Sequence, residues 1–176
     1  SGMRTRLDEL DRLASDLANV GTAGYKSERT GHRNVPRPVF DAALESAIDA
    51  SLGDRKLDAR QGAIESTGRV LDIAIEGAGF LAVDTPAGPR YTRNGHLNRA
   101  TDGSLITADG AVVRGVDGPI TVGTGKLAIE TDGTVLSDGV AVGRLAVVEF
   151  ADPGGLVRES GALLKTDAAP TPVETP

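Results

Sequence analysis

Apolar positions at the start of the chain repeat with the spacing of a helix that packs along another helix. They alternate at intervals of four and three residues, and the set is Met3, Leu7, Leu10, Ala14 and Leu17. This heptad seam predicts an amphipathic helix, which Asn19, Gly21 and Gly24 end because these residues tolerate left-handed backbone. Such a stripe is often the core face of a globular domain. Its place at the extreme N-terminus instead favours assembly with a partner.

From residue 62 to about residue 164 the pattern changes to short β-rich runs separated by turn signals. Asp-Gly pairs begin at positions 102, 109, 117, 132 and 138, and Asn94-Gly95 adds a sixth signal. These dipeptides favour primed hairpin turns, in which both central residues take positive φ. The expected strands are 70–75, 80–83, 105–107, 111–113, 120–122, 127–131 and 142–150. The pattern predicts a mainly β fold, a compact antiparallel domain with many hairpins rather than βαβ units.

Two further segments flank this domain. Residues 26–61 are a polar, Arg-rich linker in which Val35-Pro36-Arg37-Pro38 is expected to be extended. Residues 40–52 carry apolar side chains at helical intervals and are followed by Gly53, which predicts a short helix. The expected organisation is therefore an assembly helix in residues 1–25, a linker in 26–61, a β domain in 62–165 and a Pro-rich tail in 166–176.

Composition narrows the classes of partner. The 176 residues carry a net charge of −6, which argues against nucleic-acid binding because phosphate recognition needs a basic surface. The chain contains no cysteine, so neither a disulfide framework nor a thiolate site is available. No apolar run approaches the length of a membrane span, and no signal-peptide core is visible. We therefore expect no nucleic-acid partner and no direct membrane insertion.

Candidate chemical sites are few. The Asp-Gly pairs lack the alternating acidic ligands of a calcium-binding EF-hand and are expected to be turns. His32 and His96 lie far apart and do not have the spacing of zinc ligands. Ser104 is not in a Gly-x-Ser-x-Gly elbow, although a triad assembled in space stays open. We predict no catalytic, cofactor-binding or metal-binding residues and no enzymatic activity.

The sequence Gly77-Ala-Gly79-Phe80 has two glycines in a β-rich context. It lacks the third glycine and the following helix of a nucleotide-binding loop, so a nucleotide site is not expected. The glycines instead predict close backbone approach at a strand corner, with Phe80 as an anchor in the core. Arg93 is expected to pair with Asp72 or Glu76 as a structural contact.

Four blocks of the chain resemble, in order, the signatures of bacterial flagellar axial proteins. The first is Leu17-Ala-Asn19-Val-Gly-Thr-Ala-Gly24-Tyr25-Lys26, which is similar to the family's LANxxTxGYK motif and follows Ser1-Gly2-Met3, similar to ASGM. The others are residues 62–80 (TGxxLDxAIxGxGFF), residues 91–95 with 102–110 (YTRxGxF and DGxLVTxDG), and residues 129–135 with 142–153 (IxxDGTV and xGxLxLVxF). Because these blocks span nearly the whole chain, it resembles a flagellar basal-body rod protein of the rod and hook axial family.

The chain also departs from the family pattern. The family usually has two asparagines where Ser15 and Asp16 stand, and a second aromatic residue where Leu81 follows Phe80. Family members end in a long C-terminal helix that pairs with the N-terminal helix, and a Pro-rich tail cannot form it. On this resemblance we expect the chain to be truncated at both terminal helices. The unpaired seam is then expected to be disordered, to pack on the β domain or to pair with a second copy.

The resemblance implies a structural subunit that self-assembles into the rod, the drive shaft that transmits torque and surrounds the export channel in the periplasm. Its implied partners are copies of itself and other axial subunits, with ring proteins and the export apparatus as further partners. The assembly interface would comprise Met3, Leu7, Leu10, Ala14, Leu17 and Asn19. The structural motif would comprise Gly24, Tyr25, Gly77, Gly79, Phe80, Tyr91 and Arg93.

Other assignments stay open at this point. Compact length and short loops favour a rod subunit over a hook subunit, and residues 62–80 with Gly143, Leu145 and Phe150 favour the proximal over the distal rod. From another class, the β region could be a carbohydrate- or surface-binding module. Such a module needs a cluster of exposed aromatic side chains. The chain has only five aromatic residues, namely Tyr25, Phe40, Phe80, Tyr91 and Phe150.

Overall fold

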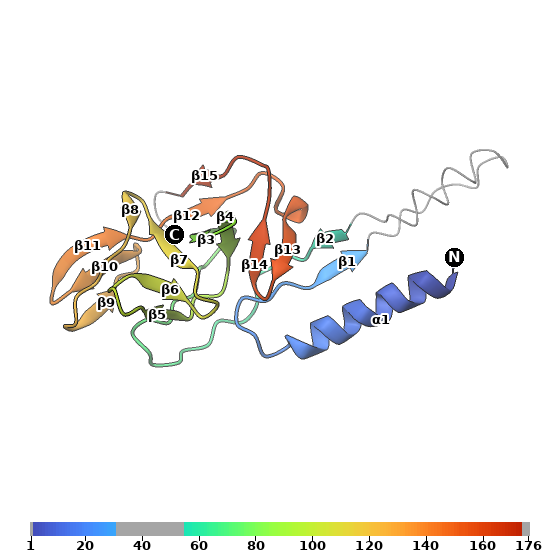
Figure 1. Cartoon of the computed structure of the whole chain (residues 1–176), viewed down its shortest axis with the longest axis horizontal. Coiled ribbons are helices and arrows are strands. Elements are labelled where there is room, and N and C mark those ends of the chain that lie inside the picture. Colours follow the sequence, from blue (N-terminus) through green and yellow to red (C-terminus); the bar gives the residue numbers. More distant parts are fainter. Residues whose placement is uncertain (1, 31–54, 174–176) are drawn as a thin grey trace.

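The computed structural model describes residues 2–30 and 55–173, and it consists of one helix and a mainly antiparallel β domain (Figure 1). The helix expected at 40–52 and the extended segment 35–38 lie outside these residues. The elements, in chain order, are α1 (Gly2–Ala18), β1 (Glu28–Thr30), β2 (Arg55–Leu57), β3 (Phe80–Thr85), β4 (Gly88–Thr92), β5 (Leu97–Arg99), β6 (Leu105–Thr107), β7 (Val112–Gly115), β8 (Gly118–Pro119), β9 (Leu127–Ile129), β10 (Thr134–Ser137), β11 (Val140–Arg144), β12 (Val147–Glu149), the 3₁₀ turn η2 (Pro153–Gly155), β13 (Val157–Ser160), β14 (Leu163–Lys165) and β15 (Thr171–Pro172).

Helix α1 forms where the heptad seam predicts it. Its interior, after Gly2, has neither glycine nor proline, and it ends at Ala18. Asn19 then closes the last turn, because its side-chain amide donates to the carbonyl oxygen of Ser15 at 2.8 Å and its backbone N–H donates to the same oxygen at 3.1 Å. Within the described residues, no helix has both the length and the apolar character needed to cross a bilayer.

The larger sheet is built around β3. Its strand order is β13-β14-β4-β3-β7-β6-β5, with β12 pairing with β3 and β15, and β8 pairing with β7. Every pairing in this sheet is antiparallel. A separate three-stranded sheet has the order β11-β10-β9 and lies at the end of the domain away from α1, and β1 pairs with β2 (Figure 1). The predicted mainly β, antiparallel fold is confirmed.

Strand β3 is buried on both faces and separates two hydrophobic clusters. Leu81 and Val83 point into the larger cluster, whereas Phe80 and Ala82 point into the second cluster. Because side chains alternate along a strand, a strand covered on both faces needs an unbroken apolar run, which Phe80–Val83 provides. The second cluster contains aromatic pairs, with Phe150 packing edge-on against Phe80 and Tyr91.

Two of the expected strands are not strands. In 70–75 and in 120–122 the pairing is limited to single bridges, Asp72 with His96 and Thr121 with Ser104. The run 142–150 divides into β11 and β12 at Leu145 and Ala146. Leu145 donates to the Gly133 carbonyl and forms a single bridge with Gly115 of β7, and Ala146 donates to the Arg114 carbonyl of β7. Strands β4, β5, β10, β13 and β14 were not among the expected strands, since they are short or rich in polar residues.

The turn chemistry differs from the prediction at most of the Asp-Gly pairs. Glycines 103, 110, 118, 133 and 139 all have positive φ, but Asp138 is the one non-glycine residue with positive φ (53°) in the described parts of the chain. Only Asp138-Gly139 therefore has the two positive φ angles of a type I′ turn. At Asp102 and Asp132 the aspartate stays in ordinary backbone and accepts a backbone N–H two residues ahead, from Ser104 and Thr134.

These carboxylates make the stability of the fold depend on acid. Backbone N–H donors lower the pKa of Asp102 and Asp132 below 3.8, and Arg90, whose guanidinium pairs with Glu159, lowers the pKa of Glu159 below 4.5. A carboxylate whose pKa is lower in the folded than in the unfolded state stabilises the fold at any pH above its unfolded pKa. This contribution is lost as the pH falls through the pKa of the folded state. We expect the thermal unfolding midpoint to be level near neutral pH and to fall below about pH 4.

Thermal unfolding followed by circular dichroism across this pH range tests the expectation. Asp132→Asn, which removes one of the titrating carboxylates, is expected to make the acid-side decrease shallower. A midpoint that rises on acidification would contradict the assignment of these carboxylates.

Candidate functional site at the junction of helix and β domain

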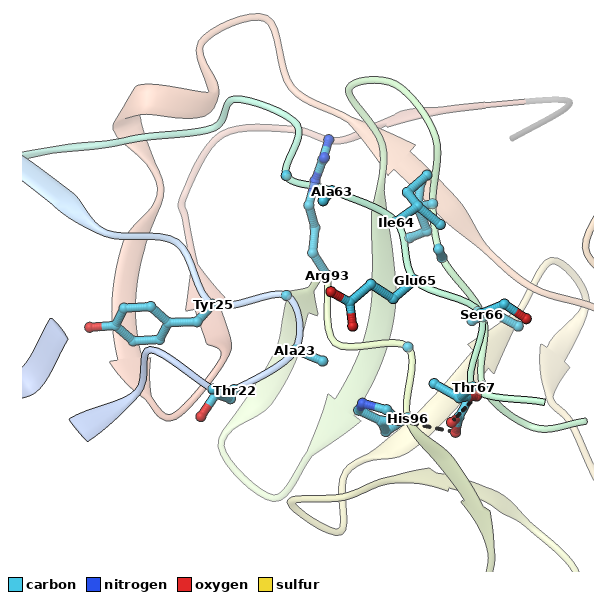
Figure 2. A pocket seen from close by; sticks show the side chains of 18 of the residues that line it. Thr22, Ala23, Tyr25, Ala63, Ile64, Glu65, Ser66, Thr67, Arg93 and His96 are labelled. Atoms are coloured by element: carbon cyan, nitrogen blue, oxygen red, sulfur yellow. Dashed lines mark hydrogen bonds and ion pairs between the residues drawn. The ribbon is translucent and has the colours of Figure 1, made fainter. Parts of the chain in front are cut away.

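Three segments far apart in the sequence meet where α1 joins the β domain. They enclose a groove of about 1000 Å³, here called the junction groove. Its lining comprises residues 20–26, 61–69 and 72–75 with Arg93, Gly95 and His96. Figure 2 shows Thr22, Ala23 and Tyr25 on one side and Ile64, Ser66 and Thr67 on the other, with Arg93 and His96 between them.

Gly24 brings the exit of α1 directly onto the β domain. It has a φ of 69°, and a Cβ placed there would lie 2.2 Å from the carbonyl carbon of Arg93 and 2.3 Å from the backbone nitrogen of Asn94. Only glycine allows both this left-handed backbone and this approach. The Gly-Tyr-Lys sequence after α1 therefore brings the chain against the backbone of Arg93 and Asn94, in addition to following the end of the helix.

Gly95 makes the second close approach and is not a hairpin turn. A Cβ on Gly95 would lie 1.8 Å from the carbonyl oxygen of Ile73. Backbone bonds surround this point, from Ile73 N–H to the Gly95 carbonyl (3.0 Å) and from Leu97 N–H to the Leu71 carbonyl (3.0 Å). The flanking strands β4 and β5 pair with other strands rather than with each other. The expectation of a turn at Asn94-Gly95 was thus wrong, because the glycine serves packing rather than chain reversal.

Arg93 lines the groove, is buried, and does not pair with Asp72 or Glu76 as expected. Its guanidinium donates to the Gln61 side-chain oxygen (3.1 Å) and the Gly77 carbonyl (2.5 Å), and lies 4.9 Å from the ring centroid of Phe80. Burial lowers the pKa of Arg93, with a smaller opposing effect from Glu149. Neutral oxygens and an aromatic face therefore hold the segment 61–77 against the β domain.

Asp72 instead belongs to a polar network at the edge of the groove. Thr67 donates its hydroxyl to Asp72 at 2.7 Å, His96 Nδ1 lies 3.1 Å from the carboxylate, and Arg69 lies 3.4 Å away. The Thr67 hydrogen bond is the largest contribution that lowers the pKa of Asp72. The network ties the loop 67–72 to the residue after Gly95. Among the described residues, no cluster of three or more His, Cys, Asp or Glu side chains is arranged to hold a metal ion.

Helix α1 contacts its own β domain through its polar face. Arg12 donates to the carbonyl oxygen of Glu28 at 3.0 Å, and Tyr25 donates its hydroxyl to Asp16 at 2.8 Å. At about 100° per residue, Arg12 lies about 180° and Asp16 about 140° from the mean direction of the apolar stripe. The stripe therefore points away from the domain. The exposed fractions of its leucines are 55% for Leu7, 61% for Leu10 and 74% for Leu17.

The remaining predicted residues lie in different places. Ala14 is exposed on α1 beside the leucines, whereas Asn19 lies partly buried at the helix end. Met3 lies in the first turn of α1. Gly77 has a φ of 93° with open space beside it, whereas a Cβ on Gly79 would lie 2.5 Å from a Val147 methyl group.

Phe80 and Tyr91 belong to the second hydrophobic cluster, with Phe80 fully buried and Tyr91 7% exposed. No sequence pattern indicated Arg12, Gln61 or Arg158, which bind partners 16 to 133 positions away. The one available signal for Arg12 is its position on α1, since helical spacing places it on the face opposite the apolar stripe.

Comparisons with known proteins identify the kind of molecule that carries this junction. Residues 74–137 match the family model "Flagellar hook protein FlgE/F/G D1 domain". The chain is 31% identical to the flagellar basal-body rod protein FlgF of Rhizobium meliloti, over 93% of the chain and 68% of the relative. It is 32% identical to FlgG of Bacillus subtilis, over 89% and 67%, and 32% identical to FlgF of Caulobacter vibrioides, over 94% and 70%.

The chain belongs to the flagellar basal-body rod protein family. As a rod protein it is a structural component of the flagellum, located in the basal-body rod. The matched family model starts at residue 74, so it covers most of the β domain that carries Arg93 and Gly95 but not α1. The alignments with the rod proteins cover 89–94% of the chain and so include most of the residues before the family model.

Proposed function

We propose that this rod protein assembles through the apolar face of α1, which packs against helices of neighbouring axial subunits. The orientation of the helix carries this proposal, because its polar face bonds to the protein's own domain and its leucines face outward. The interface would comprise Met3, Leu7, Leu10, Ala14, Leu17 and Asn19.

Energetics support a partner for this face. Burying a leucine side chain is worth about 1.5–3 kcal/mol relative to leaving it exposed, and Leu7, Leu10, Leu13 and Leu17 are all more than half exposed. An isolated helix of 17 residues is marginal in water. Packing against neighbouring subunits would therefore stabilise the helix and the assembly together.

A contact repeated between different faces of identical subunits does not close on itself and builds a helical filament. We propose that the chain occupies such a filament with copies of itself and other axial subunits, and that its β domain forms the outer layer. Surrounding ring proteins and the export apparatus are the further partners proposed. The tube would transmit torque by rigid packing and would surround the export channel.

We propose the proximal rod as the position of the subunit, with the distal rod and the hook as alternatives within the family. We also propose that the protein acts without catalysis, in keeping with relatives that are structural rod proteins. A β-rich carbohydrate- or surface-binding module is the alternative from another class. It is disfavoured because Phe80, Tyr91 and Phe150 are buried and Tyr25 is covered on one face by Arg158.

Deleting the gene in the source bacterium and examining purified basal bodies by electron microscopy tests the function. We expect the rod and filament to be lost while the membrane-embedded ring remains. The point at which the structure stops would separate the proximal from the distal rod. Intact basal bodies and normal swimming would contradict a role in the rod.

A further inference from the structure

Tyr25 lies between α1 and strand β13 and contacts both. Its hydroxyl donates to Asp16 of α1 at 2.8 Å and accepts from Arg158 Nη1 of β13 at 2.7 Å. The Arg158 guanidinium also lies 4.2 Å from the centroid of the tyrosine ring, and its Nη2 donates to the carbonyl oxygen of Lys26. One arginine thus donates to the tyrosine hydroxyl and to the Lys26 carbonyl oxygen, and it also lies over the tyrosine ring.

The chemistry of the three groups fixes the direction of these hydrogen bonds. Arginine can only donate, and the tyrosine hydroxyl has a single proton, so that proton must go to Asp16. Each bond then joins a neutral hydroxyl to a charged group, and such bonds are stronger than those between neutral groups. Burial raises the pKa of Tyr25 above its ordinary value of 10.0, which keeps the donated proton in place.

A second contact, on the same side of α1, limits rotation of the helix. Arg12 lies one helical turn before Asp16 and bonds to the Glu28 carbonyl oxygen. The segment that follows Tyr25 is itself held by the β domain, because Asp58 N–H donates to the Ser27 carbonyl at 2.8 Å and Leu57 is buried in the second cluster. The helix is therefore held at two points along one face, against a fixed segment.

We propose that Asp16, Tyr25 and Arg158 form a clamp that sets the direction and rotation of α1, so that its apolar face is presented to neighbouring rod subunits. They are positioning residues, because the apolar face itself makes the proposed assembly contact. The consequence for assembly rests on the proposed function, whereas the coupling of helix to β domain can be measured on the chain alone. An asparagine at position 16 would also offer an oxygen to the tyrosine hydroxyl, so Asp16→Asn keeps the acceptor of the clamp.

The test is ¹⁵N relaxation of backbone amides in the whole chain, comparing α1 with the β domain. In the unchanged protein, α1 amides are expected to share the rotational correlation time of the β domain. Arg158→Ala and Asp16→Ala are expected to abolish this shared value and give α1 faster, independent motion. Asp16→Asn keeps an oxygen that accepts the tyrosine proton, so its α1 amides are expected to keep the correlation time of the β domain.

Arg114→Ala is the matched control. Arg114 pairs with Asp84 on the surface of the β domain, so its loss removes an arginine ion pair without touching α1. Unchanged chemical shifts of the β-domain amides would show that Arg158→Ala leaves the β domain folded. If they change, Tyr25→Phe tests the clamp instead, because it removes only the hydroxyl. If α1 moves equally in Arg158→Ala, Tyr25→Phe and Arg114→Ala, the clamp is refuted.

Rod assembly is scored separately in cells that carry the same variants. We expect Arg158→Ala to reduce the number of complete rods and Arg114→Ala to leave it unchanged. If α1 is uncoupled in Arg158→Ala but rods form normally, the role of the clamp in presenting the helix is wrong while the chain remains a rod subunit. Loss of rods on gene deletion tests that membership independently.

Discussion

Leu10→Asp and Leu17→Asp are each expected to abolish incorporation into the rod while leaving the β domain folded. Both leucines are more than 60% exposed and point away from the domain, so the substitutions remove little native packing within the chain. In the assembled rod the same positions would bury a carboxylate against an apolar helix face. An unpaired buried charge costs several kcal/mol, which exceeds what one leucine contributes to packing.

Swimming in soft agar and electron microscopy of basal bodies measure this loss, and thermal unfolding of the purified chain measures the folding. Leu10→Met keeps an apolar side chain at the same position and is expected to assemble normally. Val140→Asp introduces the same charge at a similarly exposed position of β11 and tests whether any added carboxylate is harmful. Normal motility in Leu10→Asp and Leu17→Asp cells would overturn the helix interface.

Gly95→Ala is expected to destabilise the β domain by about 3 kcal/mol or more. The added methyl group would meet the carbonyl oxygen of Ile73 at 1.8 Å, and both Ile73 and Gly95 are held there by a backbone hydrogen bond of 3.0 Å. Relief requires residues 71–75 to move away from residues 95–97, which breaks that pairing. Urea unfolding followed by circular dichroism measures the free energy of unfolding.

Two other glycines provide graded controls for this prediction. Gly110 has a φ of 82° with no atom within 4 Å of an added Cβ, so Gly110→Ala is expected to cost only the backbone strain, about 1 kcal/mol. Gly62 has open space and no positive φ, so Gly62→Ala is expected to change stability by less than about 0.5 kcal/mol. Equal effects at all three glycines would show that the contact between residues 95 and 73 does not govern stability.

Features with a local cause could be predicted from the sequence. The heptad spacing located α1, and the apolar run Phe80–Val83 located the central strand, because one repeat or one run is sufficient for each. The Asp-Gly pairs marked reversals correctly, but they indicated the turn type only at Asp138-Gly139, since φ at the aspartate depends on the register of the flanking strands. Asn94-Gly95 is the clearest case in which the sequence is insufficient. The same dipeptide can form a hairpin turn or allow two backbone segments to approach closely, and only the fold shows which.

Contacts over long sequence distances could not be predicted. Asp72 and Glu76 are the carboxylates expected to pair with Arg93, yet the fold places Gln61 and the Gly77 carbonyl at its guanidinium. Arg158 follows a weakly patterned segment, and nothing in that segment indicates a tyrosine 133 positions earlier. The apolar stripe predicted that α1 would need a partner, but only the positions of Glu28 and Tyr25 show which side of the helix is free.

The attachment of α1 has a mechanical consequence. A twist applied to the helix would reach the β domain at three points. They are the bond from Arg12 to the Glu28 carbonyl of β1, the Tyr25 contact with Arg158 of β13, and Leu57 of β2, which is buried in the second cluster. These points lie on different strands, and Figure 1 shows β1, β2 and β13 on the side of the domain that faces α1. A load shared among several strands strains each hydrogen-bond ladder less than a pull on one edge strand, which peels bonds in succession. The helix would therefore act as a stiff lever on the β domain instead of a tether.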